Sequence, residues 1–203
     1  MVFVLPVSKQ QSKSAAQVLA KAFANDPFVS SLVPNDRPQA RLQALFNHLI
    51  KRKYLNKECI DIAFDRPTKQ VVGVALWKQP KTSAEKWWLE LLHLGHYLRI
   101  FGKNTLDVAR IDNAITKNRP VSNYWYLESI GVLEQYQRQG IGEKLLNHRL
   151  TLIDKQNSGV YLEASTLKNV VYYQKFDFIP KEEIATHTGP QVTAMWRPEK
   201  TSR

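Results

Sequence analysis

The chain has 203 residues, of which 43% are hydrophobic, and its 29 lysine and arginine residues against 18 acidic residues give a formal net charge of +11. This composition excludes intrinsic disorder, and a single cysteine, Cys59, excludes an intrachain disulfide. Charges interrupt every apolar run, and residues 1–6 lack the basic start and apolar stretch of a signal peptide. We therefore expect a single cytoplasmic domain over residues 1–203, with no membrane partner and an anionic ligand favoured by the charge.

The first half of the chain predicts a strand, two helices and a hairpin. In order, the predicted elements are a strand at 3–7, a helix capped by Ser8 and ended by Asn25-Asp26-Pro27, a helix through 42–50, and strands at 59–64 and 71–77 joined by turn residues 65–68.

The second half predicts alternating helices and strands. The predicted elements are a helical insert at about 80–120, a strand at 124–132, a helix from Ile141 to Ile153, a strand at 160–164, a helix at 169–175, and strands at 178–185 and 192–196 paired across Gly189-Pro190. Strands flanked by helices, with a hairpin at each end, predict an α/β (α+β layered) domain with a mixed sheet.

A glycine-bearing loop, Gln137–Gly142, lies between the predicted strand at 124–132 and the helix that follows. Consecutive backbone N–H groups at such a helix start are unpaired, and with the helix dipole they bind phosphate oxygens. Glycines 140 and 142 allow close approach, and Arg138 and Lys144 add positive charge. The Gly-Lys-Ser/Thr ending of a P-loop is absent, and Leu145 replaces the third small residue of a dinucleotide fingerprint. Taken alone, the loop fits a phosphate site and a simple tight helix start equally well.

The residues around this loop resemble the GNAT acetyltransferase superfamily. Gln137, Gly140 and Gly142 match its Gln/Arg-x-x-Gly-x-Gly/Ala loop, and residues 169–178 match its Asn-x-x-x-Tyr-Glu-Lys-Leu-Gly-Phe segment. The resemblance covers residues 124–178, with departures at Glu134, where proline is frequent, and at Asp177, where glycine is usual. The insert at 80–120 and residues 125–128 resemble the puromycin N-acetyltransferase-like branch. The resemblance implies the GNAT fold, with a central, mostly antiparallel sheet flanked by helices.

The resemblance also implies acetyl-CoA as the acyl donor. Its pantetheine would contact the strand residues Ile130, Gly131 and Val132, with the Val132 amide polarising the thioester carbonyl, and Asn169 would contact the pantetheine or phosphate arm. The pyrophosphate would lie on the backbone of the loop residues Gln137, Arg138, Gln139, Gly140, Ile141, Gly142 and Glu143.

The chemistry that the resemblance implies is direct attack by an amine of a small molecule or peptide, which requires a base. Glu128 lies two residues before Ile130, so period-two alternation predicts that both face the same side of the sheet. A carboxylate that only orders a hydrogen-bond network is an equal interpretation of Glu128, and Glu163 is the alternative base, although a structural or substrate-contacting role suits it better. Tyr173 aligns with the tyrosine that protonates the departing thiolate; ordinary packing is the competing interpretation, with Tyr172 as the alternative core residue.

The remaining sequence features give weaker indications of function. His93 and His96 lack a third ligand nearby in the sequence, so we expect no metal site. We expect Cys59 to be a core residue. The competing functional hypothesis is a catalytically silent basic module that binds nucleic acid or another polyanion. No nucleic-acid motif is recognisable, so we do not expect that partner. We expect a monomer or a homodimer.

Overall fold

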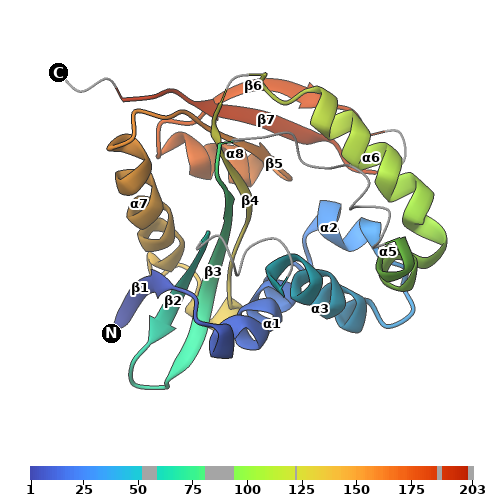
Figure 1. The fold of residues 1–203 in the computed structure, drawn as a ribbon, viewed down its shortest axis with the longest axis horizontal. Coiled ribbons are helices and arrows are strands. Elements are labelled where there is room, and N and C mark those ends of the chain that lie inside the picture. The colour runs from blue at the N-terminus through green and yellow to red at the C-terminus, as the bar shows by residue number, and fades with distance from the viewer. Residues whose placement is uncertain (52–58, 81–93, 122, 187–188, 201–203) are drawn as a thin grey trace.

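The protein is built on a seven-stranded sheet in the order β1-β2-β3-β4-β5-β7-β6 (Figure 1). The computed structural model describes residues 1–51, 59–80, 94–121, 123–186 and 189–200. The strands are β1 (Val2–Pro6), β2 (Ile60–Asp65), β3 (Gln70–Lys78), β4 (Trp125–Val132), β5 (Val160–Ala164), β6 (Ile179–Ile184) and β7 (Val192–Arg197). All neighbours pair antiparallel except β4 and β5, which are parallel. The predicted mixed, mostly antiparallel sheet is confirmed.

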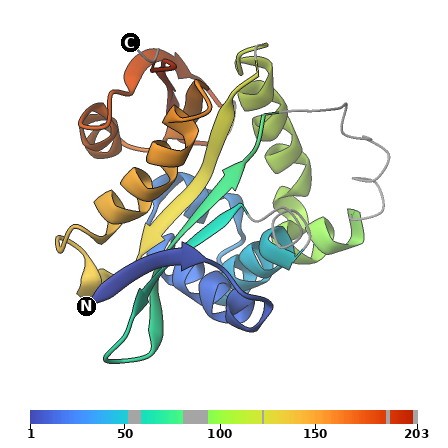
Figure 2. The ribbon, with the colours of Figure 1, turned by 60° about the vertical axis from the view of Figure 1, so that its left-hand side comes forward.

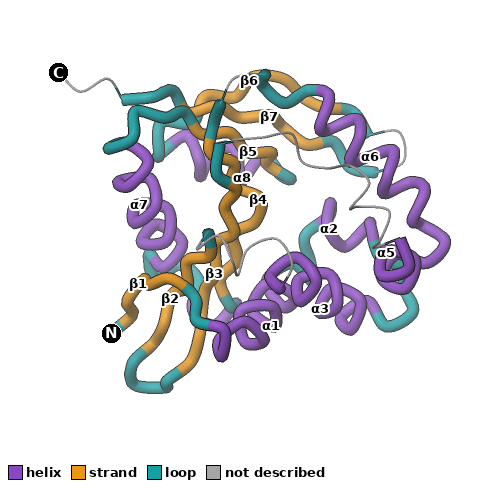
Figure 3. The backbone as a smooth tube through the Cα atoms, in the orientation of Figure 1, coloured by secondary structure: helices purple, strands orange, loops and turns teal. Residues whose placement is uncertain are grey.

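Helices cover both faces of this sheet, as the turned view shows (Figure 2). The α-helices are α1 (Ser12–Ala22), α2 (Pro27–Leu32), α3 (Pro38–Leu49), α5 (Leu94–Phe101), α6 (Thr105–Lys117), α7 (Ile141–Asp154) and α8 (Leu167–Gln174). Short 3-10 turns are η1 (Lys9–Gln11), η3 (Gly102–Asn104) and η4 (Glu134–Tyr136). Helix α7 packs on β1 to β4, and α1 packs on β3 and β4 (Figure 3). Helix α1 also contacts α3, which contacts α5, and α5 contacts α6. Helix α8 lies against β5, β6 and β7.

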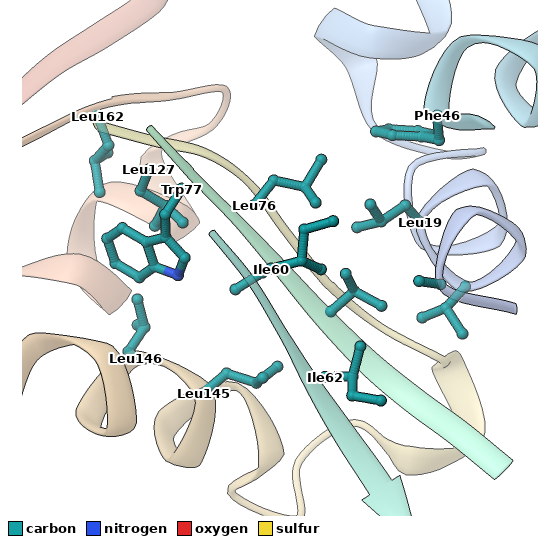
Figure 4. Packing of buried hydrophobic residues seen from close by; sticks show 14 of the residues in the cluster. Leu19, Phe46, Ile60, Ile62, Leu76, Trp77, Leu127, Leu145, Leu146 and Leu162 are labelled. Carbon is teal, nitrogen blue, oxygen red and sulfur yellow. The ribbon is translucent and has the colours of Figure 1, made fainter. Parts of the chain in front are cut away.

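The core is divided by the sheet because neighbouring residues on a strand point to opposite faces. Trp77 lies with Leu127 and Leu146 on the α7 side, while Leu76 points toward Leu19 and Phe46 (Figure 4). Trp77 and Leu76 are both fully buried, and burying a large apolar side chain stabilises the fold by about 1.5–3 kcal/mol. Cys59 is buried as well, so its predicted place in the core is confirmed.

The predicted elements agree with the structure except near residue 26. Asn25-Asp26-Pro27 was predicted only to end the first helix, but Asp26 also begins α2. Its Oδ1 accepts hydrogen bonds from the amides of Phe28 (3.0 Å) and Val29 (2.8 Å), and proline follows at the first helical position. In the predicted insert, α5 and α6 are helical, whereas the part at 81–93, with His93, lies outside the described residues. Across the described ranges, no helix combines the length and apolar character needed to cross a membrane.

Candidate functional site

Strands β4 and β5 separate after only two paired positions. Trp125 pairs with Val160 and Tyr126 with Tyr161, but β4 continues along β3 as far as Val132. The Leu133 amide donates to Val72 O at 2.9 Å, and antiparallel bonding alternates, so the backbone groups of Ile130 and Val132 point away from β3 into the opening. One of them, the Val132 carbonyl, accepts from Gln137 Nε2 at 3.1 Å. The opening therefore exposes backbone donors beside the glycine loop.

Gly131, between those two residues, has a packing reason for its missing side chain. A Cβ at this position would lie 2.7 Å from Ala22 Cβ of α1. By the same alternation, its backbone groups pair with β3 and not with the opening. Of the three predicted pantetheine contacts, Ile130 and Val132 have the required direction, and Gly131 mainly permits α1 to approach β4.

A β-bulge places Glu128 on a different face from the one that alternation predicts. Trp77 pairs with Leu127 and Leu76 with Ser129, so Glu128 is the extra residue in β4. The expectation that Glu128 shares a face with Ile130 is wrong, because one added residue reverses the alternation. The Glu128 carboxylate lies on the face of α1 and α6, where its Oε1 is 2.7 Å from Lys78 Nζ.

The glycine loop has the geometry of an anion cradle. Arg138 (φ 59°) and Gly140 (φ 73°) both adopt the left-handed conformation, and Gly140 is the N-cap of α7. The first helical bond runs from the Lys144 amide to Gly140 O at 3.0 Å. Within the described part of the chain, no acceptor bonds the six consecutive amides of residues 138–143. Six unpaired donors at the positive end of a helix form a site for a phosphate group.

Helix α8 closes against this cradle through Tyr172. A Cβ on Gly142 would lie 2.8 Å from the Tyr172 hydroxyl oxygen, so only glycine allows this contact. Burial, together with the negative charge of Glu143, raises the pKa of Tyr172 to about 12, so its hydroxyl keeps its proton at neutral pH. The cradle is therefore bordered by a phenol that can donate a hydrogen bond.

Asn169 belongs to a hydrogen-bond chain that sequence patterns did not reveal. Its Nδ2 donates to Ser165 Oγ (3.1 Å), which donates to Asp26 Oδ2 (2.6 Å). A carboxylate only accepts, so the Ser165 proton must point to Asp26, and Ser165 can only accept from Asn169. This polarity turns the Asn169 carbonyl oxygen away from Ser165. The only local sequence signal was Asp26 before a proline; its partner lies 139 residues away.

Tyr173 is more deeply buried than Tyr172, contrary to the alternative that assigned the core position to Tyr172. Its ring packs edge-on against Phe178 (centroids 5.8 Å apart) and against Tyr172 (5.5 Å). Burial raises the pKa of the Tyr173 phenol well above its usual value, and the charges of Tyr172 and Asp26 raise it further. A protonated phenol held rigidly can serve as a general acid.

On the face of α5 and α6, a cavity of about 940 Å³ opens beside the bulge. Its wall contains Glu128 and Lys78 with aromatic and apolar side chains, among them Tyr97, Phe101, Val108, Tyr124 and Tyr126. The volume falls in the range of ligand sites, and an apolar wall with a few charged groups is typical of them. The cavity lies at the closed end of the β4–β5 opening, where Tyr126 forms the last β4–β5 pair.

Glu163 bonds two residues of the cavity wall, Arg119 and Tyr126. Its Oε1 accepts from Arg119 Nε (3.0 Å), and its Oε2 accepts from the Tyr126 hydroxyl (2.6 Å). Burial and the Glu163 charge raise the pKa of Tyr126 well above its usual value, so this phenol stays a donor. Burial alone would lower the pKa of Arg119, but the charges of Tyr126 and Glu163 raise it instead. The network supports the structural interpretation of Glu163, whereas the Glu128 carboxylate lines the cavity.

Comparisons with known proteins show which families and folds the chain is similar to. Residues 103–180 match the family model described as the acetyltransferase (GNAT) domain. An uncharacterized N-acetyltransferase of Schizosaccharomyces pombe is 23% identical over 190 residues, which cover 88% of this chain and 74% of that protein. A solved structure described as histone acetyltransferase HPA2 and related acetyltransferase, from Corynebacterium glutamicum, has a TM-score of 0.77 and 29% identity over 99% of this chain and 98% of its own. PaiA N-acetyltransferase from Thermoplasma acidophilum, solved in complex with coenzyme A, shares the fold with a TM-score of 0.61 and 11% identity over 98% and 99%.

Proposed function

Because the chain belongs to the GNAT acetyltransferase superfamily, we propose that it transfers an acetyl group from acetyl-CoA to an amine of a small molecule or peptide by direct attack. One observation carries the proposal: the six unpaired amides of residues 138–143 lie next to the opening between β4 and β5. We further propose that residues 1–203 act as one acetyltransferase domain.

The residues present fit acetyl-CoA as a substrate. The cradle amides, with exposed Arg138 and Lys144 nearby, supply donors and charge for a pyrophosphate. The exposed backbone of Ile130 and Val132 supplies amide partners for an extended pantetheine arm. Asn169, fixed through Ser165 by Asp26, presents an oriented carbonyl oxygen from the opposite wall. A thioester then lies near the closed end of the opening, beside Glu128 and the cavity.

The acceptor occupies that cavity in this proposal. An acceptor ammonium must lose a proton before it attacks, and Glu128, directly or through a water molecule, receives it. The Val132 amide donates a hydrogen bond toward the carbonyl oxygen that gains charge. Tyr173 donates a proton to the departing thiolate, a role that suits its raised pKa because the phenol keeps its proton until it is needed.

The test is acetyl-CoA-dependent release of free thiol across a panel of amines, polyamines, amino acids, aminoglycosides and peptides. The proposal predicts that at least one acceptor class accelerates thiol release and carries the acetyl group on nitrogen. If acetyl-CoA fails to bind at millimolar concentration, or binds without any acceptor being modified, the proposal is wrong.

A further inference from the structure

Lys78 already occupies the position that an acceptor amine needs. Its Nζ lies 2.7 Å from Glu128 Oε1, and it lies 5.3 Å above the centre of the Tyr126 ring. A carboxylate and an aromatic face are the two partners that bind an ammonium group. The Lys78 side chain is 29% exposed and lines the cavity, so it is accessible from the cavity.

The sheet register brings this amine to the end of the β4–β5 opening. Lys78 pairs with Tyr126, which pairs with Tyr161, so the three residues form one row across β3, β4 and β5. This row holds the last β4–β5 pair before the strands separate. Cross-strand neighbours point to the same face, and Lys78 and Tyr126 both line the cavity beside Glu128. A thioester at the closed end of the opening would therefore meet the Lys78 amine first.

From this placement we propose that Lys78 is an internal acceptor and that the protein acetylates it in cis; this inference rests on the proposed function. The Lys78 ammonium gives one proton to Glu128, which passes it to solvent. The neutral Nζ attacks the carbonyl carbon of acetyl-CoA, an N–C bond forms, and the C–S bond breaks. After the addition, Nζ gives its second proton to Glu128 and through it to solvent. Coenzyme A leaves as thiolate and takes a proton from Tyr173, which solvent reprotonates. The products are acetylated Lys78, coenzyme A thiol and one proton released to solvent.

Acetylation of Lys78 changes the site that it occupies. The amide product carries no charge, so the ion pair with Glu128 is lost. The Lys78 ammonium then no longer competes with an incoming acceptor for Glu128, and the cavity keeps the Glu128 carboxylate and the Tyr126 ring. The modification therefore prepares the cavity for an external ammonium acceptor.

The experiment incubates the full chain with acetyl-CoA without an added amine and follows each lysine by peptide mass spectrometry. Lys181, exposed on the edge strand β6, is the matched control for uncatalysed acetylation. We expect Lys78 to be labelled roughly 10²-fold faster than Lys181, at a rate independent of protein concentration. Glu128→Gln should slow labelling of Lys78 by about the same factor and leave Lys181 unchanged. Lys78→Arg, with an unaltered melting temperature, should remove only this label.

Three results would overturn the inference. The first is labelling of Lys78 no faster than that of Lys181. The second is equally fast labelling of Lys78 in heat-denatured protein. The third is a labelling rate that rises with protein concentration, which indicates transfer between copies. Thiol release with external amines separates the two proposals. Turnover of an amine without Lys78 labelling refutes the internal acceptor alone, whereas no binding of acetyl-CoA refutes both.

Discussion

Gly142 should be the most sensitive position of the cradle, because its missing side chain makes room for Tyr172. An alanine Cβ would lie 2.8 Å from the Tyr172 hydroxyl oxygen, well inside van der Waals contact. Either the first turn of α7 or the Tyr172 ring must shift, and overpacking of this kind costs about 1–3 kcal/mol. If the cradle amides bear about 1.4 kcal/mol of that strain, Gly142→Ala should weaken acetyl-CoA binding about tenfold.

Tyr172→Phe supplies the matched control. It removes the offending oxygen, and the next atom of that ring, Cζ, lies 3.7 Å from where the alanine Cβ would stand, an ordinary contact. Tyr172→Phe alone should change the Kd by less than about threefold, and the double variant should bind nearly as tightly as the native protein. Calorimetric titration of the four proteins gives a coupling free energy, expected at about 1.4 kcal/mol.

Two results would refute this reasoning. Native affinity in Gly142→Ala would mean that the Tyr172 ring moves aside and the cradle amides do not bear the strain. A double variant as weak as Gly142→Ala would mean that the loss comes from the Cβ itself and not from the contact with Tyr172.

Other predictions concern catalysis and orientation. Tyr173→Phe should lower kcat roughly 10²-fold with the acetyl-CoA Kd unchanged, and an unchanged kcat would exclude its acid role. Because burial raises the pKa of Tyr173 above 10.0, its phenol stays protonated and kcat should not fall between about pH 8 and 10. A fall in kcat over that range that is present in the native protein and absent in Tyr173→Phe would contradict this. Glu128→Gln should lower kcat by about 10²-fold, and a normal rate would exclude the base. Ser165→Ala should raise the Kd of acetyl-CoA about fivefold, because it removes the hydrogen bond that orients Asn169, which is worth about 1 kcal/mol. A larger effect on kcat than on Kd would contradict a positioning role for Ser165.

The sequence predicted those parts of the fold that are encoded locally. Hydrophobic periodicity located the hairpin of β2 and β3 and the strand–loop–helix unit around Gly140, because each depends on residues within one short segment. Helix α2 was not predicted because its six residues are too few for a periodic pattern. In addition, the Asp26-Pro27 pair that begins α2 is also typical of the end of a preceding helix.

The arrangement of the site depends on long-range contacts that no local pattern contains. The bulge at Glu128 arises from the pairing of β3 with β4, so simple alternation gave the wrong face. The partners of Glu163 and Ser165 likewise come from distant segments: Arg119 precedes Glu163 by 44 residues, and Asp26 precedes Ser165 by 139. Glu128, Glu163 and Asn169 could be predicted as site residues from the sequence, but their contacts could be determined only from the fold.

The most direct test of the account compares acetyl-CoA with S-acetylpantetheine, which carries the same thioester but lacks the pyrophosphate and the nucleotide. If the amides of residues 138–143 hold the pyrophosphate, calorimetry should show acetyl-CoA binding at least about 10²-fold more tightly, since several charge-assisted hydrogen bonds of about 1.5–3 kcal/mol each are lost with the shorter ligand. Equal affinities, or no binding of acetyl-CoA at millimolar concentration, would contradict the assignment of the cradle.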